Sequence, residues 1–287
     1  MPENKSISRR LAVKSSIFGI MAVSLPHASY AKSAKGFEND ISGGSKLLNR
    51  YPSIDDIIVA EVVGASHFNL DRVKELVDAR PELARATWDW GFGDWETAIG
   101  AASHVGRKDI VDYLMSKGAR PDIFTYAMLG SFNSVKSMIE ATPGVQSIAG
   151  PHGITLLQHI TTGMRSKDIS PAKMDEYHQL VTYVENIGGA DNRAPDIQMS
   201  ETDKSKYIGD YLYGEGPEDG FSIKLNMRKM LSLGKIGKFG GGLYQKAPNV
   251  FTYNGVSSVE ISFQIENNVV HSLTVHEPEL VLLAKKI

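Results

Sequence analysis

The chain has 287 residues, 42% of them hydrophobic, so it is long enough to bury a substantial core in one or two domains. Its formal net charge of −2 provides no positive field for a phosphate backbone, which argues against nucleic acid as a partner. It contains no cysteine, which excludes disulfides and thiolate chemistry, so any metal would be held by His, Asp or Glu.

Residues 1–31 are predicted to form an export signal. Arg9 and Arg10 precede a mildly apolar run at 17–25, and small residues near Ala31 suit cleavage. The arginine pair resembles a twin-arginine signal. Because the apolar run is too short to span a bilayer, we expect no stable membrane insertion once the signal is removed. The mature protein would then be periplasmic or otherwise exported.

Two polar segments are predicted to be linkers. Residues 32–52 are rich in Gly and Ser and show neither a helical nor a strand period. Residues 193–204 are also polar, and they separate a helical pattern from a β-rich one. We therefore expect a helical domain at 53–192 and a β domain at 205–287.

The stretch GDWETAIGAASHVGRKDIVDYLMSKGARPD, which starts at residue 93, is typical of one repeating unit of two short helices. The chain breaks at Gly106 between the helices, and Gly118 ends the second helix. The apolar stripe of the second helix consists of Ile110, Val111, Leu114 and Met115. This unit resembles the ankyrin repeat: Thr97 and Gly118 match that motif, whereas Ala98 and Gly100 replace its Pro and His.

Similar patterns precede and follow this unit. A shift of 38 residues towards the N-terminus and one of 24 towards the C-terminus align comparable apolar stripes, and residues 154–191 resemble a fourth, interrupted unit. The ankyrin resemblance implies an α-solenoid of about four units over 53–192, stabilised by stacking of neighbours.

Short β-rich runs separated by Gly, Asn and Pro fill residues 205–287. They predict a small antiparallel β-sheet or open β-barrel. The region weakly resembles the β domain of many bacterial exported hydrolases, through Tyr207, Gly209 and Tyr211. The expected fold class is therefore α+β in separate domains, with an ankyrin-repeat solenoid followed by this β domain.

No familiar catalytic or nucleotide-binding motif is present: there is no G-x-S-x-G, H-E-x-x-H, Walker A motif or G-x-G-x-x-G after a strand. We therefore assign no catalytic residue, metal site or cofactor from the sequence.

The three tryptophans, Trp88, Trp90 and Trp95, fall within eight residues. In the expected stack they would lie at the finger between two units, where large rigid rings suit a protein-binding hot spot. The rings could instead fold back over the end of the core, because tryptophan is highly buried on average.

Histidines and carboxylates form a second constellation. His104 ends the first helix of one unit and His152 precedes a later unit, so both could face one groove beside Asp94 and Glu96. His67 aligns one residue past His104 in the first unit. Stacked helices lie about 10 Å apart, close enough for such a group to hold a metal or an acid/base pair. The same side chains could instead cap the loops between units.

Together these patterns predict a non-enzymatic, exported binding protein that recognises a protein partner through its fingers and concave face. The alternative is a small-molecule-binding protein or an enzyme with its site at the junction of the repeats and the β domain. A third interpretation is that the helices only support a functional β domain. The candidate binding residues are Trp88, Trp90, Trp95, His104, His152, Asp94 and Glu96.

Overall fold

The computed structural model describes residues 51–193, 196–238 and 240–287. The predicted export signal at 1–31 and nearly all of the predicted linker at 32–52 lie outside the described residues. Within these ranges, no helix combines the length and the apolar character that crossing a membrane requires. The helices and the β strands together belong to one compact unit, Ser53–Ile287.

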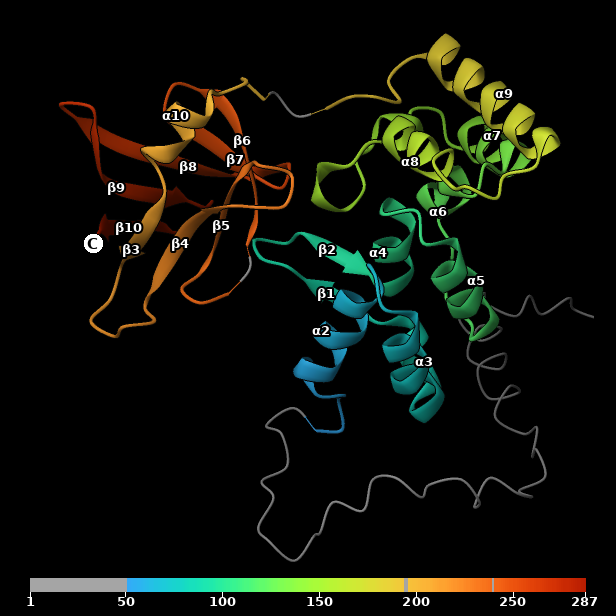
Figure 1. Cartoon of the computed structure of the whole chain (residues 1–287), viewed down its shortest axis with the longest axis horizontal. Helices are drawn as coiled ribbons and strands as arrows, with labels where there is room; N and C mark the ends of the chain where they lie inside the picture. Colours follow the sequence, from blue (N-terminus) through green and yellow to red (C-terminus); the bar gives the residue numbers. More distant parts are fainter. Residues whose placement is uncertain (1–50, 194–195, 239) are drawn as a thin grey trace, which may run out of the picture. The chain divides into compact units, whose positions relative to one another are not determined.

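Short helices fill the first part of this unit (Figure 1). Polar caps start several of them: the side chains of Asn69, Thr97 and Thr155 each accept a backbone N–H from the first turn. The helices are α2 (Asp56–Ala65), α3 (Leu70–Ala79), α4 (Ala98–His104), α5 (Lys108–Ser116), α6 (Ile123–Met128), α7 (Phe132–Ala141), α8 (Leu156–Gly163) and α9 (Pro171–Ile187). Single 3-10 turns, η2 (Pro81–Arg85), η3 (Val145–Ser147) and η4 (Pro151–Gly153), lie in the connections.

The two helices predicted within residues 93–122 are confirmed as α4 and α5. In α5, three residues of the predicted apolar stripe, Ile110, Val111 and Leu114, are fully buried, whereas the fourth, Met115, is 36% exposed. Gly118 follows the helix with a φ of +91°, a left-handed conformation that glycine adopts without strain. The 3.6-residue period thus locates individual helices and their buried faces.

The prediction of an ankyrin-repeat solenoid is wrong. A solenoid buries one continuous core between stacked units, whereas the buried apolar side chains of these helices form two separate cores. The first core draws mainly on α2 to α5 and includes Val63 and Leu114. The second draws on α6 to α9 and includes Leu156 and Leu180. The apolar period marks the buried face of each helix but does not determine which helices share a core.

A two-stranded hairpin lies between α3 and α4. Its antiparallel strands are β1 (Thr87–Asp89) and β2 (Trp95–Thr97), and Trp88 pairs with Glu96. Because successive side chains of a strand point to opposite faces, Glu96 is buried while the neighbouring Trp95 is exposed. The hairpin carries all three tryptophans.

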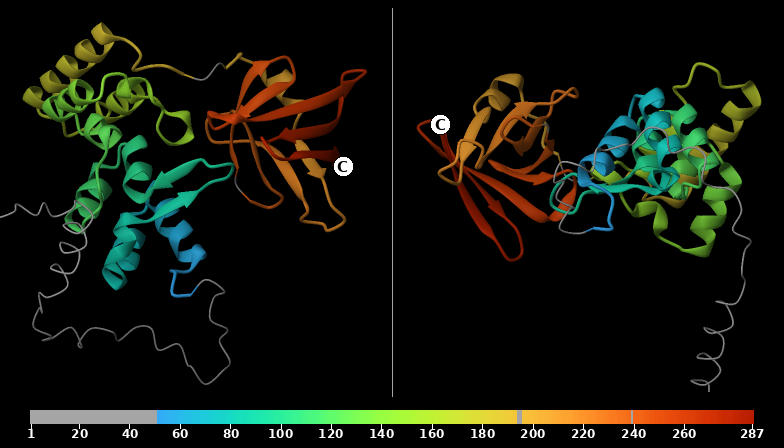
Figure 2. Two further views of the ribbon diagram at one scale, coloured as in Figure 1. Left: turned by 180° about the vertical axis from the view of Figure 1, so that it is seen from behind. Right: turned by 90° about the horizontal axis from the view of Figure 1, so that it is seen from below.

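The C-terminal part is a closed antiparallel barrel (Figure 2). Strand β10 pairs with both β9 and β3, which closes the sheet. The expectation of an open barrel or sheet in a separate domain is therefore corrected to a closed barrel within the same compact unit. Tyr211, Phe251 and Phe263 pack together in its interior. Helix α10 (Glu201–Ser205) precedes the strands β3 (Gly209–Leu212), β4 (Gly220–Leu225), β5 (Leu231–Lys235), β6 (Gly241–Ala247), β7 (Val250–Tyr253), β8 (Val256–Glu266), β9 (Val269–His276) and β10 (Val281–Lys286).

Candidate functional site: a histidine and glutamate cluster

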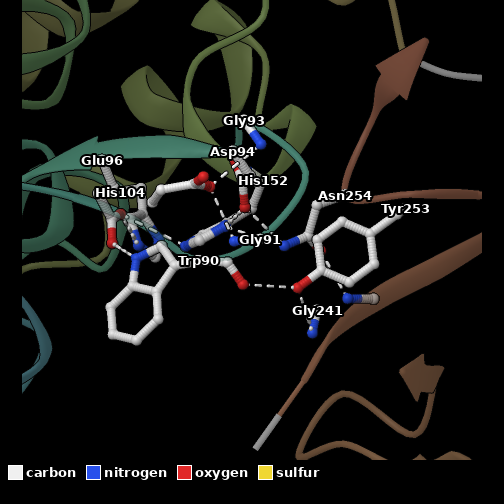
Figure 3. Close-up of polar contacts among 12 residues, drawn as sticks. Trp90, Gly91, Gly93, Asp94, Glu96, His104, His152, Gly241, Tyr253 and Asn254 are labelled. Carbon is white, nitrogen blue, oxygen red and sulfur yellow. Dashed lines mark hydrogen bonds and ion pairs between the residues drawn. The ribbon is translucent and has the colours of Figure 1, made fainter. Parts of the chain in front are cut away.

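Four titratable side chains from separate segments of the chain meet at the hairpin, and Figure 3 labels three of them, Glu96, His104 and His152. His67 lies in the turn after α2, Glu96 in β2, His104 at the end of α4 and His152 in η4. One nitrogen or oxygen atom from each lies within 4.8 Å of those of all the others. We call these four residues the His/Glu cluster.

The connection that carries His152 is held in an uncommon conformation. His152 has a φ of +59°, which few residues other than glycine adopt. Its backbone N–H donates to Oδ1 of the buried Asp94 at 2.9 Å, and its ring Nδ1 lies 2.6 Å from Oδ2 of the same carboxylate. Asp94 therefore fixes both the backbone and the ring orientation of His152.

The distances within the cluster are those of a small coordination shell. Glu96 Oε1 lies 3.0 Å from His104 Nε2 and 3.4 Å from His152 Nε2, and Glu96 Oε2 lies 3.4 Å from His67 Nε2. Four ligands bound tetrahedrally at about 2.0–2.2 Å from a zinc ion would be separated by roughly 3.4 Å. The side chain of Glu96 is fully buried, and those of His67 and His152 keep 22% and 20% exposure.

In His67 and His152, the hydrogen bond of Nδ1 to an oxygen acceptor determines that Nε2 faces the cluster. His67 Nδ1 lies 3.1 Å from the carbonyl oxygen of Gly64, which can only accept, so Nδ1 carries a proton. His152 Nδ1 faces the Asp94 carboxylate in the same way. In the neutral rings, Nε2 then presents its lone pair to the cluster. This arrangement of an outer acceptor behind a ligating imidazole is the usual support of histidine metal ligands.

Two inward-facing atoms have no hydrogen-bond partner. Glu96 Oε1 and His104 Nε2 are buried and form an ion-pair contact of 3.0 Å when the imidazole is charged, but neither atom makes a hydrogen bond. The other carboxylate oxygen, Oε2, accepts a hydrogen bond of 2.7 Å from Trp90 Nε1. Buried polar atoms without partners are rare and costly. A cation bound between Oε1 and Nε2 would satisfy both.

Charge within the cluster shifts several pKa values. Burial raises the pKa of Glu96, but His104 and His152 outweigh burial and hold it well below its usual range. Burial lowers the pKa of His152, but Asp94 and Glu96 outweigh burial and raise it to about 9. For His67, burial dominates over the nearby Glu96 and lowers the pKa. The buried carboxylates can thus be balanced by a proton on His152 or by a bound cation.

The structure brings together five of the seven candidate residues: Asp94, Glu96, His104 and His152, and also Trp90, whose indole N–H donates to Glu96. Trp88 and Trp90 are half-buried against the first helical core, whereas Trp95 is 62% exposed. Trp88 and Trp90 therefore fit the interpretation in which the rings fold back on the core, and Trp95 fits the interpretation as an exposed binding residue.

Sequence reasoning left three residues of this region out of the candidate set. His67 carried a signal, because it aligns one residue past His104 in the shifted comparison. Tyr253 and Asn254 of the barrel also reach the site, through hydrogen bonds to the Trp90 carbonyl and to Asp94. Tyr253 ends β7 and Asn254 lies in the turn that follows, far along the chain from the hairpin, so no sequence pattern linked either residue to Asp94.

Comparisons of the chain with models of protein families, with curated proteins and with solved structures found no match. They therefore do not identify an ankyrin repeat protein, and the family resemblance stays a prediction from sequence.

Proposed function

We propose that the protein binds a divalent transition-metal ion, best suited by zinc, at the His/Glu cluster. The observation that carries the proposal is a pair of buried atoms that make no hydrogen bond, Glu96 Oε1 and His104 Nε2, which lie 3.0 Å apart beside the His152 imidazole. The ligands would be Nε2 of His67, His104 and His152 together with Glu96 Oε1.

The ligand chemistry supports zinc. Imidazole suits zinc, copper, iron and nickel, and three imidazoles with one carboxylate, all with a donor atom within 4.8 Å of one another, are compatible with zinc. Four protein ligands make a closed site, which is typical of structural rather than catalytic zinc. The proposed role of the ion is to hold together the hairpin, the end of α4 and the η4 connection.

Zinc titration of the full chain tests the proposal. Protein stripped with a chelator is titrated with zinc against a chromophoric competitor, and we expect one zinc ion per chain. His104→Ala removes a ligand and Glu96→Gln removes the negative charge of a ligand, so each should weaken zinc binding by at least about 100-fold. His178→Ala, which changes an exposed histidine of α9, should bind as the parent does.

Melting temperatures without zinc show whether each variant folds. Substoichiometric binding by the parent, or unchanged affinity in folded Glu96→Gln protein, would contradict the proposal. If the protein binds copper or nickel but not zinc, the proposed ligands stand and the identity of the metal ion is corrected.

The exposure of Trp95 favours a second candidate function, recognition of a protein partner in the exported compartment. Trp95 borders a hollow of about 360 Å³ whose lining also includes Asp122, Phe124 and Pro151. An exposed tryptophan beside such a hollow is typical of a binding hot spot. Affinity capture with the parent and with Trp95→Ala, matched for melting temperature, tests this. The idea fails if the variant retains the same proteins as the parent.

A further inference from the structure

The end of β7 and the turn that follows it bring two barrel side chains, Tyr253 and Asn254, to the hairpin (Figure 3). The Tyr253 hydroxyl donates to the Trp90 carbonyl at 2.9 Å, and Asn254 Nδ2 donates to Asp94 Oδ2 at 2.7 Å. The second contact concerns the metal site directly, because the same Asp94 oxygen lies 2.6 Å from His152 Nδ1.

Asp94 thus depends on two different parts of the chain. Its side chain is 4% exposed, and a buried carboxylate requires donors to offset its lost hydration. His152 supplies a backbone and a ring donor, and Asn254 supplies the amide donor. The Asn254 amide nitrogen and His152 Nδ1 are 3.2 Å apart and converge on one oxygen.

Asn254 is itself held firmly by the barrel. Its Oδ1 accepts from the Gly242 N–H at 2.5 Å, and its own backbone N–H donates to the Gly242 carbonyl at 2.8 Å. With Oδ1 on an N–H donor and Nδ2 on a carboxylate, the amide has only one orientation that satisfies both ends. The side chain is also buried, with 7% of the residue exposed.

We infer that Asn254 is a positioning residue of the metal site: the barrel completes the site by holding Asp94, which in turn orients the His152 imidazole. The inference rests on the proposed function. Partners behind a metal ligand commonly change metal affinity by about 10–100-fold. Because linkage is reciprocal, metal binding also strengthens this contact between barrel and hairpin.

The test compares two asparagines that both occupy left-handed turn positions. Asn254 has a φ of +44° and Asn268, in the β8–β9 turn, has a φ of +65°, so glycine fits both backbones. Asn254→Gly should weaken zinc binding by about 10–100-fold and shift the visible absorption of the cobalt-substituted protein. Asn268→Gly should change neither.

Asn254→Asp tests the hydrogen-bond donor alone. It keeps the size of the side chain but replaces the amide N–H that donates to Asp94 with a carboxylate oxygen. We expect it to weaken zinc binding at least as much as Asn254→Gly. It also serves as the second variant if the glycine variant does not fold, with melting temperatures measured for each.

The outcomes of the two proposals differ. If the parent binds no metal, the proposed function fails. If the parent binds zinc and both folded Asn254 variants bind within about threefold of it, with an unchanged cobalt spectrum, the positioning role of Asn254 is overturned while the site stands.

Discussion

At the scale of single residues, Trp90 determines which oxygen of Glu96 is free. Its Nε1 donates to Glu96 Oε2 at 2.7 Å, so Oε1 is left to face the imidazoles. Its ring packs on the first helical core, and its carbonyl accepts from Tyr253. This tryptophan therefore supports the cluster, which is a different role from the exposed hot spot considered from sequence.

Trp90→Phe should distinguish the effect of the indole N–H hydrogen bond from the effect of the packing of the ring. The phenyl ring retains much of the packing, but Glu96 Oε2 loses its donor, so we expect roughly tenfold weaker zinc binding. The loss should also lower the free energy of unfolding by about 1–3 kcal/mol. Competitive zinc titration and urea unfolding measure the two effects, with Trp88→Phe as the control on the same hairpin. Equal effects of the two variants on zinc affinity would point to packing instead of hydrogen bonding.

One further histidine, His159, is buried and does not belong to the His/Glu cluster. Its Nδ1 donates to the Thr155 carbonyl at 2.8 Å, its Nε2 has no hydrogen-bond partner, and its ring lies 4.8 Å from that of Phe124. Burial is the main cause that lowers its pKa from 6.5 to about 4. His159 therefore folds as the neutral imidazole at neutral pH.

This depressed pKa predicts a pH dependence of stability. Because the unfolded chain binds the proton more tightly, the contribution of neutral His159 is complete above pH 6.5 and is lost as the pH falls towards 4. Between about pH 7 and pH 5 the parent should lose about 2 kcal/mol more than His159→Leu. Urea unfolding at the two pH values measures the difference. Equal losses in parent and variant would show that His159 does not carry this dependence.

At the scale of secondary-structure elements, close packing of α8 depends on a glycine. A Cβ on Gly163 would lie 1.9 Å from the Met128 carbonyl oxygen and 2.5 Å from the Tyr177 hydroxyl. Gly64 of α2 differs, because a Cβ there would meet only the Trp90 ring at an ordinary 3.6 Å. Neither glycine has a positive φ, so the space around it is what distinguishes them.

The two Gly→Ala changes should therefore have opposite signs. Alanine is favoured over glycine in a helix by about 1 kcal/mol, so Gly64→Ala should raise the free energy of unfolding by up to that amount. Gly163→Ala should lower it by on the order of 1–3 kcal/mol, because the overlap with backbone outweighs helix propensity. Urea unfolding of both variants measures the pair. A stabilised Gly163→Ala protein would show that α8 does not pack this closely on α6.

Element-scale features were largely accessible from sequence. Apolar spacing located α3, α5 and α7, and the turn at Gly106 and the cap at Gly118 follow from glycine chemistry. What could not be predicted is how elements combine. Nothing in a helical period shows that Leu114 and Leu180 belong to different cores, or that β10 returns to pair with β3.

At the scale of the whole molecule, the site is assembled from segments far apart in sequence. The proposed ligands span His67 to His152, and Asn254 supports them from the barrel. Sequence reasoning grouped Asp94, Glu96, His104 and His152 because stacked units were expected to bring these side chains to one groove, and the structure brings them together although the solenoid is absent from the described residues. It could not identify Asn254, because the contact with Asp94 exists only once the barrel has closed and its turn meets the hairpin.

This assembly predicts coupled unfolding of helices and barrel. Calorimetry of the full chain should show one transition that moves to higher temperature with zinc, since the ion binds only the folded site. Zinc at about 100 times its Kd should add about 2.7 kcal/mol of stability. Two transitions of which zinc moves only one would instead show that the barrel unfolds independently of the cluster.

The placement of all three tryptophans on the hairpin β1–β2 has an optical consequence. Excitation at wavelengths that only indole absorbs makes the intrinsic emission of this protein a report from a single hairpin, adjacent to the His/Glu cluster. The barrel, whose interior rings are tyrosine and phenylalanine, is silent in that signal. The three indoles therefore act as an intrinsic local fluorophore, and a change in their emission can be assigned to the hairpin without introducing a label.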